Sequence, residues 1–221
     1  MGYLYHGSIV PNITFLKSVS KLHNGLPDEV VYLTANRAYA LFYIWDADNN
    51  KRTNKWVTCS IKNGICIYYE QFPDQLRAFY DGVKGYLYSV RNKSFEKTDE
   101  EDMYVNKSTV SMDKCEIIDN VYEEILRIES AGNLKIVRYK SLSAEEQNRI
   151  VDMIVGYIEK KQLLLSPMSE EAVFISTYYR EAWEKAKKNA ARKNTGRHFV
   201  KQPICSHLLR SLYKSLLSQY L

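Results

Sequence analysis

The sequence lacks any long apolar run. No window reaches the roughly 18 uninterrupted apolar residues that a membrane-spanning helix requires, and the N-terminus shows no charged segment followed by an apolar stretch. We therefore expect no transmembrane helix, no signal peptide and no membrane partner. A cytoplasmic location is the resulting expectation.

Clustered metal ligands are also missing. The four cysteines, Cys59, Cys66, Cys115 and Cys205, form no C-x-x-C pair and have no histidine at ligand spacing. We therefore expect no metal site. Cys59 and Cys66 lie in alternating apolar stretches, where a cysteine usually serves as a small buried hydrophobe.

Acidic residues are scarce near the C-terminus. Residues 180–201 contain eight lysines and arginines against two glutamates, whereas residues 1–179 carry a net charge of −3. Lys185, Lys188 and Arg192 would share one face of a helix, a pattern typical either of a phosphate-binding surface or of a solvated helix face. The basic segment therefore leaves a nucleic-acid partner open, and a protein partner as well.

Alternating bulky residues predict several strands. Asn63-Gly64 is the strongest hairpin signal of the chain, so residues 55–71 should form two strands around it. Residues 115–128 fit either a strand or a helix. The other expected strands share β-branched and aromatic residues next to turn signals, and they are 3–6, 30–34, 85–90, 103–106 and 134–139.

Capping residues predict the helices. Ser143, followed by Glu146, forms a capping box that should open a helix to about residue 162. The other expected helices are 36–46, 73–80, 169–194 and 203–221. Strands with short helices, followed by helices alone, predict an α+β fold. We expect residues 1–140 to form the main domain and residues 141–221 a helical, basic C-terminal extension packed on it.

Three short motifs with ligand-like chemistry follow one another in the sequence. Tyr5-His6-Gly7-Ser8 ends the first strand, and its glycine lets a ligand approach the backbone because it has no Cβ. Val31-Tyr32-Leu33-Thr34 is a strand directly followed by a helix. The acidic run of residues 99–102 precedes the strand 103–106.

This order of motifs resembles the ADP-ribosyltransferase superfamily. The similarity is to its His-Tyr-Glu branch, which includes diphtheria-toxin-like enzymes, poly(ADP-ribose) polymerases, rifampin ADP-ribosyltransferases and RNA 2'-phosphotransferases. It covers roughly residues 3–128. It implies a split antiparallel β-sandwich of ADP-ribosyltransferase type, with NAD as the substrate.

The resemblance also implies roles for the first two motifs. His6 would hydrogen-bond the adenosine ribose of NAD, and the Gly7 backbone would receive the nicotinamide carboxamide. Tyr32 would stack its ring on the nicotinamide, and Thr34 would support the pocket. Ser8 is a further candidate for a ribose contact, although a serine at a strand end commonly bonds to the backbone.

The third motif would supply a carboxylate that grips a hydroxyl of the nicotinamide ribose, and we assign this role to Glu101. Asp102 directly precedes the strand, where the family commonly has glutamate, and it remains an alternative, as do Glu123 and Glu124. Arg37 would meet the diphosphate through charge-assisted hydrogen bonds or would lie solvated at a helix start.

These expectations add up to an NAD-dependent mono-ADP-ribosyltransferase. The enzyme would cleave the nicotinamide–ribose bond and transfer ADP-ribose to a macromolecular or small-molecule acceptor, as a toxin or defence enzyme would. The basic residues on which RNA 2'-phosphate removal depends are not located in the sequence. The alternative is a non-enzymatic module that binds nucleic acid or protein through its basic helical tail.

Overall fold

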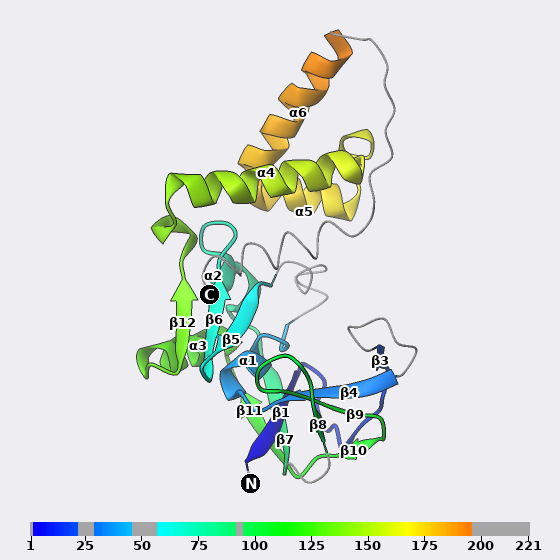
Figure 1. Cartoon of the computed structure of the whole chain (residues 1–221), viewed down its shortest axis with the longest axis vertical. Helices are drawn as coiled ribbons and strands as arrows, with labels where there is room; N and C mark the ends of the chain where they lie inside the picture. The colour runs from blue at the N-terminus through cyan, green and yellow to red at the C-terminus, as the bar shows by residue number, and fades with distance from the viewer. Residues whose placement is uncertain (1, 22–28, 46–56, 92–94, 196–221) are drawn as a thin grey trace.

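The computed structural model describes residues 2–21, 29–45, 57–91 and 95–195, and it is a mixed α+β architecture. Figure 1 shows a large sheet at one end of the long axis, a smaller sheet in the middle and helices at the other end. The expected helix over 203–221 and part of the basic segment lie outside the described residues. No helix of the described ranges is long and apolar enough to cross a membrane.

The large sheet is antiparallel throughout, and β1 lies near its centre. Its strands run in the order β11-β7-β1-β4-β9-β8, with β3 (Ser20–Lys21) paired to β4. The strands are β1 (Tyr3–Ser8), β4 (Glu29–Thr34), β7 (Gly85–Arg91), β8 (Glu96–Lys97), β9 (Met103–Asn106) and β11 (Lys114–Ile118). The expected strands in this region are confirmed, and the first motif therefore lies on a central strand.

The smaller sheet contains the expected hairpin. β5 (Cys59–Lys62) and β6 (Ile65–Tyr69) pair around Asn63 and Gly64, which both have positive φ, 51° and 75°. Such a two-residue turn matches the twist of the flanking strands. β12 (Leu134–Val137) joins β6 in parallel, so this sheet departs from an all-antiparallel arrangement. A third pairing joins β2 (Phe15–Leu16) and β10 (Val110–Ser111).

The short helices begin at the expected caps. Asn36 caps α1 (Arg37–Leu41) by accepting a hydrogen bond from the Tyr39 amide, but α1 ends well before residue 46. α2 (Gln75–Tyr80) is followed by Gly82 at φ 73°. The ambiguous segment 115–128 contains both elements, since β11 ends at Ile118 and α3 (Val121–Ser130) starts after the Asn120 cap.

The long helices follow the capping box. Ser143 and Glu146 exchange both hydrogen bonds at the start of α4 (Ala144–Lys160). The single helix expected over 169–194 is wrong, because the chain breaks at Tyr179 into α5 (Glu170–Tyr178) and α6 (Arg180–Thr195). Tyr179 is only 5 % exposed and its hydroxyl bonds Gln71, so burial of this side chain accompanies the break. Two short 3₁₀ helices, η2 (Tyr139–Ser141) and η3 (Leu163–Leu165), flank α4.

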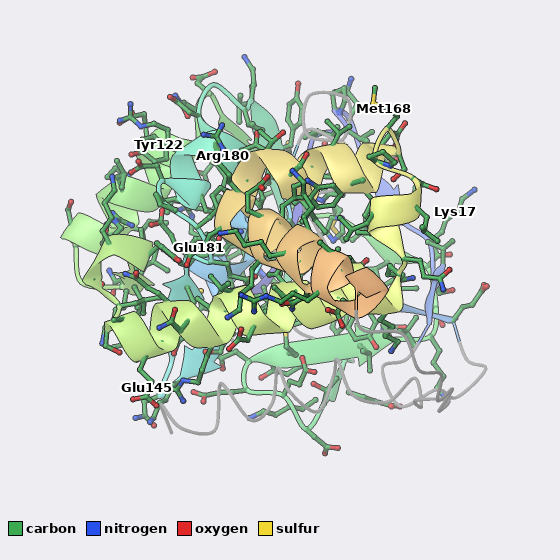
Figure 2. All side chains as sticks on the ribbon, turned by 90° about the horizontal axis from the view of Figure 1, so that it is seen from above. Lys17, Tyr122, Glu145, Met168, Arg180 and Glu181 are labelled. Atoms are coloured by element: carbon green, nitrogen blue, oxygen red, sulfur yellow. The ribbon has the colours of Figure 1, made fainter. Side chains whose placement is uncertain are left out.

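One hydrophobic core joins the helices to the smaller sheet. Phe72, before α2, packs against Tyr178 of α5, and Phe79, in the last turn of α2, packs against Phe174 of α5, with ring centroids 4.9 and 6.3 Å apart. Seen from above in Figure 2, α6 lies between α4 and α5. The same core reaches α1, α3 and β6. The helical C-terminal part is therefore packed on the strands, and a domain boundary at residue 140 stays a prediction.

Candidate functional site

The site forms where β1 and β4 separate. β1 pairs with β7 at six positions, from Tyr3 to Ser8, but it pairs with β4 at one position, Tyr5 opposite Thr34. Beyond this position the two strands diverge, although they are neighbours in the sheet. Backbone groups on the β4 side of β1 are therefore left outside the ladder, and buried backbone groups require hydrogen-bond partners.

A pocket of about 250 Å³ lies at this divergence. Its walls come from β1, β4, the end of α1 and the start of β9. It brings together four residues predicted from the first two motifs, namely His6, Gly7, Tyr32 and Thr34. The remaining lining residues are Tyr5, Ser20, Leu33, Ala40, Tyr43 and Met103. The first and second motifs thus share one cavity.

His6 is held against the neighbouring strand. Burial lowers the pKa of its imidazole below the ordinary value, and a hydrogen bond with the backbone of Tyr32 opposes this shift. A bond that favours the charged form is one in which the imidazole donates to a carbonyl. His6 is therefore hydrogen-bonded to the backbone of β4 in the region where β1 and β4 no longer pair.

Gly7 is required first by the packing of α1. A Cβ at this position would lie 2.1 Å from the Ala40 carbonyl oxygen and 2.8 Å from Ile44 Cγ1. No side chain fits there unless α1 moves away from β1. The sequence predicts that Gly7, which has no Cβ, lets a ligand approach the backbone. The structure gives a second reason for glycine at this position, which is the close contact between α1 and β1.

Thr34 and Ser8 make local backbone contacts. Thr34 Oγ1 accepts a 3.1 Å hydrogen bond from the Asn36 amide, which positions the start of α1. Ser8 Oγ accepts from the Val10 amide at 3.1 Å and does not belong to the pocket lining. Thr34 is thus part of the pocket wall, whereas the ribose contact of Ser8 stays a prediction.

The acidic motif lies beside the pocket rather than in its lining. Glu101 is exposed, and its Oε1 accepts a 2.7 Å hydrogen bond from the Gly64 amide at the hairpin tip. Met103, two residues later, lines the pocket, since β9 pairs Met103 with Thr34. Asp102 lines a second pocket on the other side of this chain segment. Of the predicted acidic residues, Glu101 and Asp102 are the two that directly precede the pocket-lining residue Met103 in the sequence.

Arg37 and the acids of α3 form a separate network. Arg37 donates at 2.6 Å both to Glu124 Oε1 and to Glu116 Oε1, and Arg127 binds Glu124 through two hydrogen bonds of 2.8 Å. Arg127, followed by Arg37, lowers the pKa of Glu124. Arg37 lines the second pocket and is not among the residues around His6. Glu123 is exposed on α3 and lines neither pocket.

Sequence reasoning missed Tyr43. Tyr43 lines the first pocket, and its hydroxyl donates to Tyr39 Oη at 3.2 Å. Its pKa is raised to about 12, chiefly by burial of the hydroxyl, with added contributions from the charges of Cys59 and Glu100. Tyr39 and Tyr43 are four residues apart in the sequence, a spacing that places two side chains on the same face of a helix. This spacing is the sequence signal that could have identified Tyr43.

The basic stripe expected on α6 is partly neutralised. Lys185 Nζ lies 2.6 Å from Asp152 Oδ1 on α4, and Lys187 pairs with Glu184 at 2.9 Å. Lys188 and Arg192 are exposed. The nucleic-acid surface stays a prediction, and Lys185, which belongs to it, is engaged with Asp152.

Comparison of the chain with protein-family models, with curated proteins and with solved structures found no match. Among the described residues there is no group of three or more histidine, cysteine or acidic side chains positioned to hold a metal ion. The chemistry of the site therefore has to be inferred from the pocket itself.

Proposed function

We propose that the protein is an NAD-dependent mono-ADP-ribosyltransferase whose nicotinamide site is the pocket between β1 and β4. The observation that carries this proposal is the convergence of His6, Gly7, Tyr32 and Thr34 on one cavity at the point where two neighbouring strands part. The sequence resemblance assigns NAD contacts to these four residues. Their convergence supports that assignment, because the motifs are separated by about 26 residues in the sequence.

The open edge of β1 suits a carboxamide. A primary amide carries both a donor and an acceptor, as a peptide group does, and it can occupy the place of a missing strand neighbour. In the proposal, the nicotinamide carboxamide bonds the Gly7 backbone on the side from which β4 has withdrawn. The proposed ligand thus occupies the part of a central strand that β4 leaves unpaired.

The aromatic lining suits the nicotinamide ring. Tyr32 is half-buried in the pocket wall, and Tyr43 lies in the same lining with 48 % of its surface exposed. The face of a tyrosine ring attracts a planar cation, and NAD carries its positive charge on the nicotinamide. In the proposal, the ring of Tyr32 stacks on the nicotinamide and Tyr43 contributes a second aromatic surface.

A carboxylate would then assist departure of the nicotinamide. Cleavage of the nicotinamide–ribose bond builds positive charge on the sugar, as in glycoside hydrolysis, and a fixed anion stabilises that state more than the substrate. In the proposal, Glu101 supplies this anion from the segment that leads into pocket-lining Met103. Its hydrogen bond to the Gly64 amide engages one carboxylate oxygen and leaves the other for a ribose hydroxyl.

The test is release of nicotinamide from NAD by the purified protein. We expect Tyr32→Ala to reduce release by a factor of at least one hundred, and Tyr32→Phe, which keeps the ring, to retain most of it. Glu101→Gln should reduce the rate of release while NAD still binds. Glu123→Gln is its matched control, since Glu123 is exposed and lines neither pocket.

Two outcomes would overturn the proposal. One is nicotinamide release that is equal in wild type, Tyr32→Ala and Glu101→Gln, because the activity would then not come from this pocket. The other is the absence of NAD binding by calorimetry together with tight, salt-sensitive RNA binding. That result would favour the alternative of a nucleic-acid-binding module.

A further inference from the structure

The strand order of the large sheet ends in two edge strands of different character. β8 has two residues, Glu96 and Lys97, and both are charged. β11, at the other end of the order, has five residues and includes Cys115 and Ile117. Short, charged edge strands resist pairing with another chain, whereas a longer edge with apolar side chains accepts it. Of these two edges, β11 is the one suited to pairing.

The outer edge of β11 is open within the described part of the chain. β7 is the only strand that pairs with β11 there. The first four of its five side chains are exposed, and Ile117 has 59 % of its surface exposed. An edge strand of this kind offers backbone groups to which a further strand can add.

The charged and the apolar side chains of β11 lie on opposite faces of the sheet. Successive residues of a strand alternate between the two faces. Lys114 and Glu116 therefore share one face, and Cys115 and Ile117 share the other. A strand that pairs with this edge would meet a lysine and a glutamate on one face and apolar groups on the other.

Both charged side chains already have a contact within their own chain, and both remain exposed. Glu116 Oε1 accepts a hydrogen bond from Arg37, but 54 % of the Glu116 side chain is exposed. Lys114 Nζ lies 4.7 Å from the centroid of the Tyr3 ring, and this lysine is also exposed. Neither charge is enclosed, so each can meet an opposite charge from a second chain.

Symmetry restricts how two copies of this edge can pair. Neighbouring residue pairs in an antiparallel ladder alternate between hydrogen-bonded and non-hydrogen-bonded pairs. A two-fold axis perpendicular to the sheet must therefore pass between two equivalent residues, one from each copy. The residue that lies on the axis decides which side chains face each other.

One position of the axis within β11 pairs opposite charges. An axis at Cys115 places Lys114 of each copy opposite Glu116 of the other. An axis at Lys114 or at Glu116 places identical charges directly opposite each other, which is destabilising. An axis at Ile117 or at Ile118 brings neither charged residue opposite an opposite charge. The sequence of the strand thus favours the axis at Cys115.

The same axis gives the apolar face of the strand a neighbour. The two Cys115 side chains would lie directly opposite each other, and Ile117 of each copy would lie diagonally from Cys115 of the other. Diagonal neighbours on one face of a sheet are within reach of long side chains. Tyr86 of β7, which is paired with Ile117, is half-buried and extends this apolar face.

We propose that two copies of this chain pair antiparallel through β11, around a two-fold axis at Cys115, and so join their large sheets into one. The occupant of the edge is a second copy because the charge pattern of the strand is complementary to itself. A single pair of strands buries less area than a standard interface, so the dimer dissociates on dilution. This inference is independent of the proposed function, since no residue of β11 lines the pocket between β1 and β4.

Reversal of charge tests the register. In a dimer of this kind Lys114→Glu brings acid opposite acid at both pairs, and Glu116→Lys brings cation opposite cation. Each variant alone should dimerise at least tenfold more weakly than wild type in analytical ultracentrifugation over a dilution series. A mixture of the two variants restores opposite charges at both pairs and should dimerise nearly as well as wild type.

Two controls accompany this measurement. Lys135→Glu changes an exposed lysine on β12, an edge strand of the smaller sheet, and should leave dimerisation unchanged. Circular dichroism checks that both variants are folded, because Glu116→Lys also removes a partner of Arg37.

Oxidation tests the position of the axis independently. Directly opposite residues of an antiparallel pair have Cα atoms about 4.5–5.5 Å apart, which is within the range of a disulfide. Added diamide, which accepts the two electrons and two protons of a pair of thiols, should therefore crosslink the wild-type dimer through Cys115. Cys115→Ser should dimerise without forming this crosslink.

Three outcomes would overturn the proposal. The first is a wild-type protein that stays monomeric at every concentration. The second is a mixture of the two charge variants that dimerises no better than either variant alone, because β11 would then not pair in this register. The third is a dimer that Cys115 does not crosslink, since its axis would lie elsewhere.

Discussion

The two pockets on either side of the α1 entry differ in what they offer a ligand. The pocket between β1 and β4 has no lysine, arginine, aspartate or glutamate in its lining, and it offers aromatic faces and backbone groups. The pocket beneath the hairpin tip is lined by Arg37, Arg127 and Asp102. The first pocket thus presents aromatic faces and backbone groups, and the second presents charged side chains.

This difference has a structural origin. The first pocket exists because two strands of one sheet pair at a single position, so its walls depend on the backbone and on the fit of α1 against β1. The second exists where three elements meet through ion pairs and two hydrogen bonds at Gly64. A change of backbone packing should therefore affect the first, and a change of charge the second.

The largest effect should follow from Gly7→Ala, which breaks the first pocket. The new Cβ would meet the Ala40 carbonyl at 2.1 Å, and overpacking of this kind costs about 3 kcal/mol of unfolding free energy. Gly156→Ala in α4 is the control, since its Cβ would meet nothing within 4 Å and alanine favours a helix by about 0.5–1 kcal/mol. Urea denaturation measures both. A Gly7→Ala protein as stable as wild type would contradict the close packing of α1 on β1.

A smaller effect should follow from Glu124→Gln, which disturbs the second pocket. The change removes the shared partner of Arg37 and Arg127, at a cost of about 1.5 kcal/mol for lost charge-assisted hydrogen bonds. Glu123→Gln, an exposed neighbour, should cost much less. Because the folded-state pKa of Glu124 is lowered by Arg127 and Arg37, its stabilisation is present above pH 5 and is lost as the pH falls further. Equal denaturation midpoints for the two variants at pH 7 would show that this network does not contribute to the stability of the fold.

His6 should give a pH dependence specific to the first pocket. Burial lowers its folded-state pKa below the unfolded value of about 6.5, so the unfolded chain binds more protons and stability falls as the pH drops below that value. We expect the melting temperature to fall less between pH 7.5 and 5.5 in His6→Asn than in wild type. Parallel pH profiles would show that His6 does not titrate in this manner.

The smallest effect should come from outside both pockets. Lys185→Ala removes the exposed ion pair with Asp152, and such surface pairs contribute about 0.5 kcal/mol or less. The loss should shrink further in high salt, because exposed charges are screened. A loss above 1 kcal/mol in thermal unfolding would mean that the contact of α6 with α4 depends on this pair.

Elements with their own local signal were predictable from the sequence. The Asn63-Gly64 hairpin, the Ser143 capping box and the strand that follows the acidic run all appear where expected, since each depends on residues close together in the chain. The segment 115–128 was ambiguous for a physical reason: it contains a strand and a helix, and a window across both mixes their periods.

Long-range features were not predictable in the same way. The partners of Arg37 lie 79 and 87 residues away, and nothing near residue 37 distinguishes an arginine that pairs with two glutamates from one that awaits a ligand. The break at Tyr179 has no proline or glycine to signal it, and it accompanies a contact with Gln71 far back in the chain. In the candidate site, the sequence motifs identified His6 and Tyr32. Tyr43 could be identified only from the structure, because its place in the pocket depends on how α1 packs against β1.

The contact of Tyr179 with Gln71 limits how the protein can be shortened. Gln71 also bonds the Gln75 side chain through its amide and Thr58 through its own side chain, so a polar chain runs from the break between α5 and α6 to the residue preceding β5. A truncation before α5 would expose Phe72 and Phe79 and would remove the Tyr179 hydroxyl that donates to Gln71 Oε1. A minimal fragment of this protein that keeps the hairpin in place must therefore include the helices that follow it.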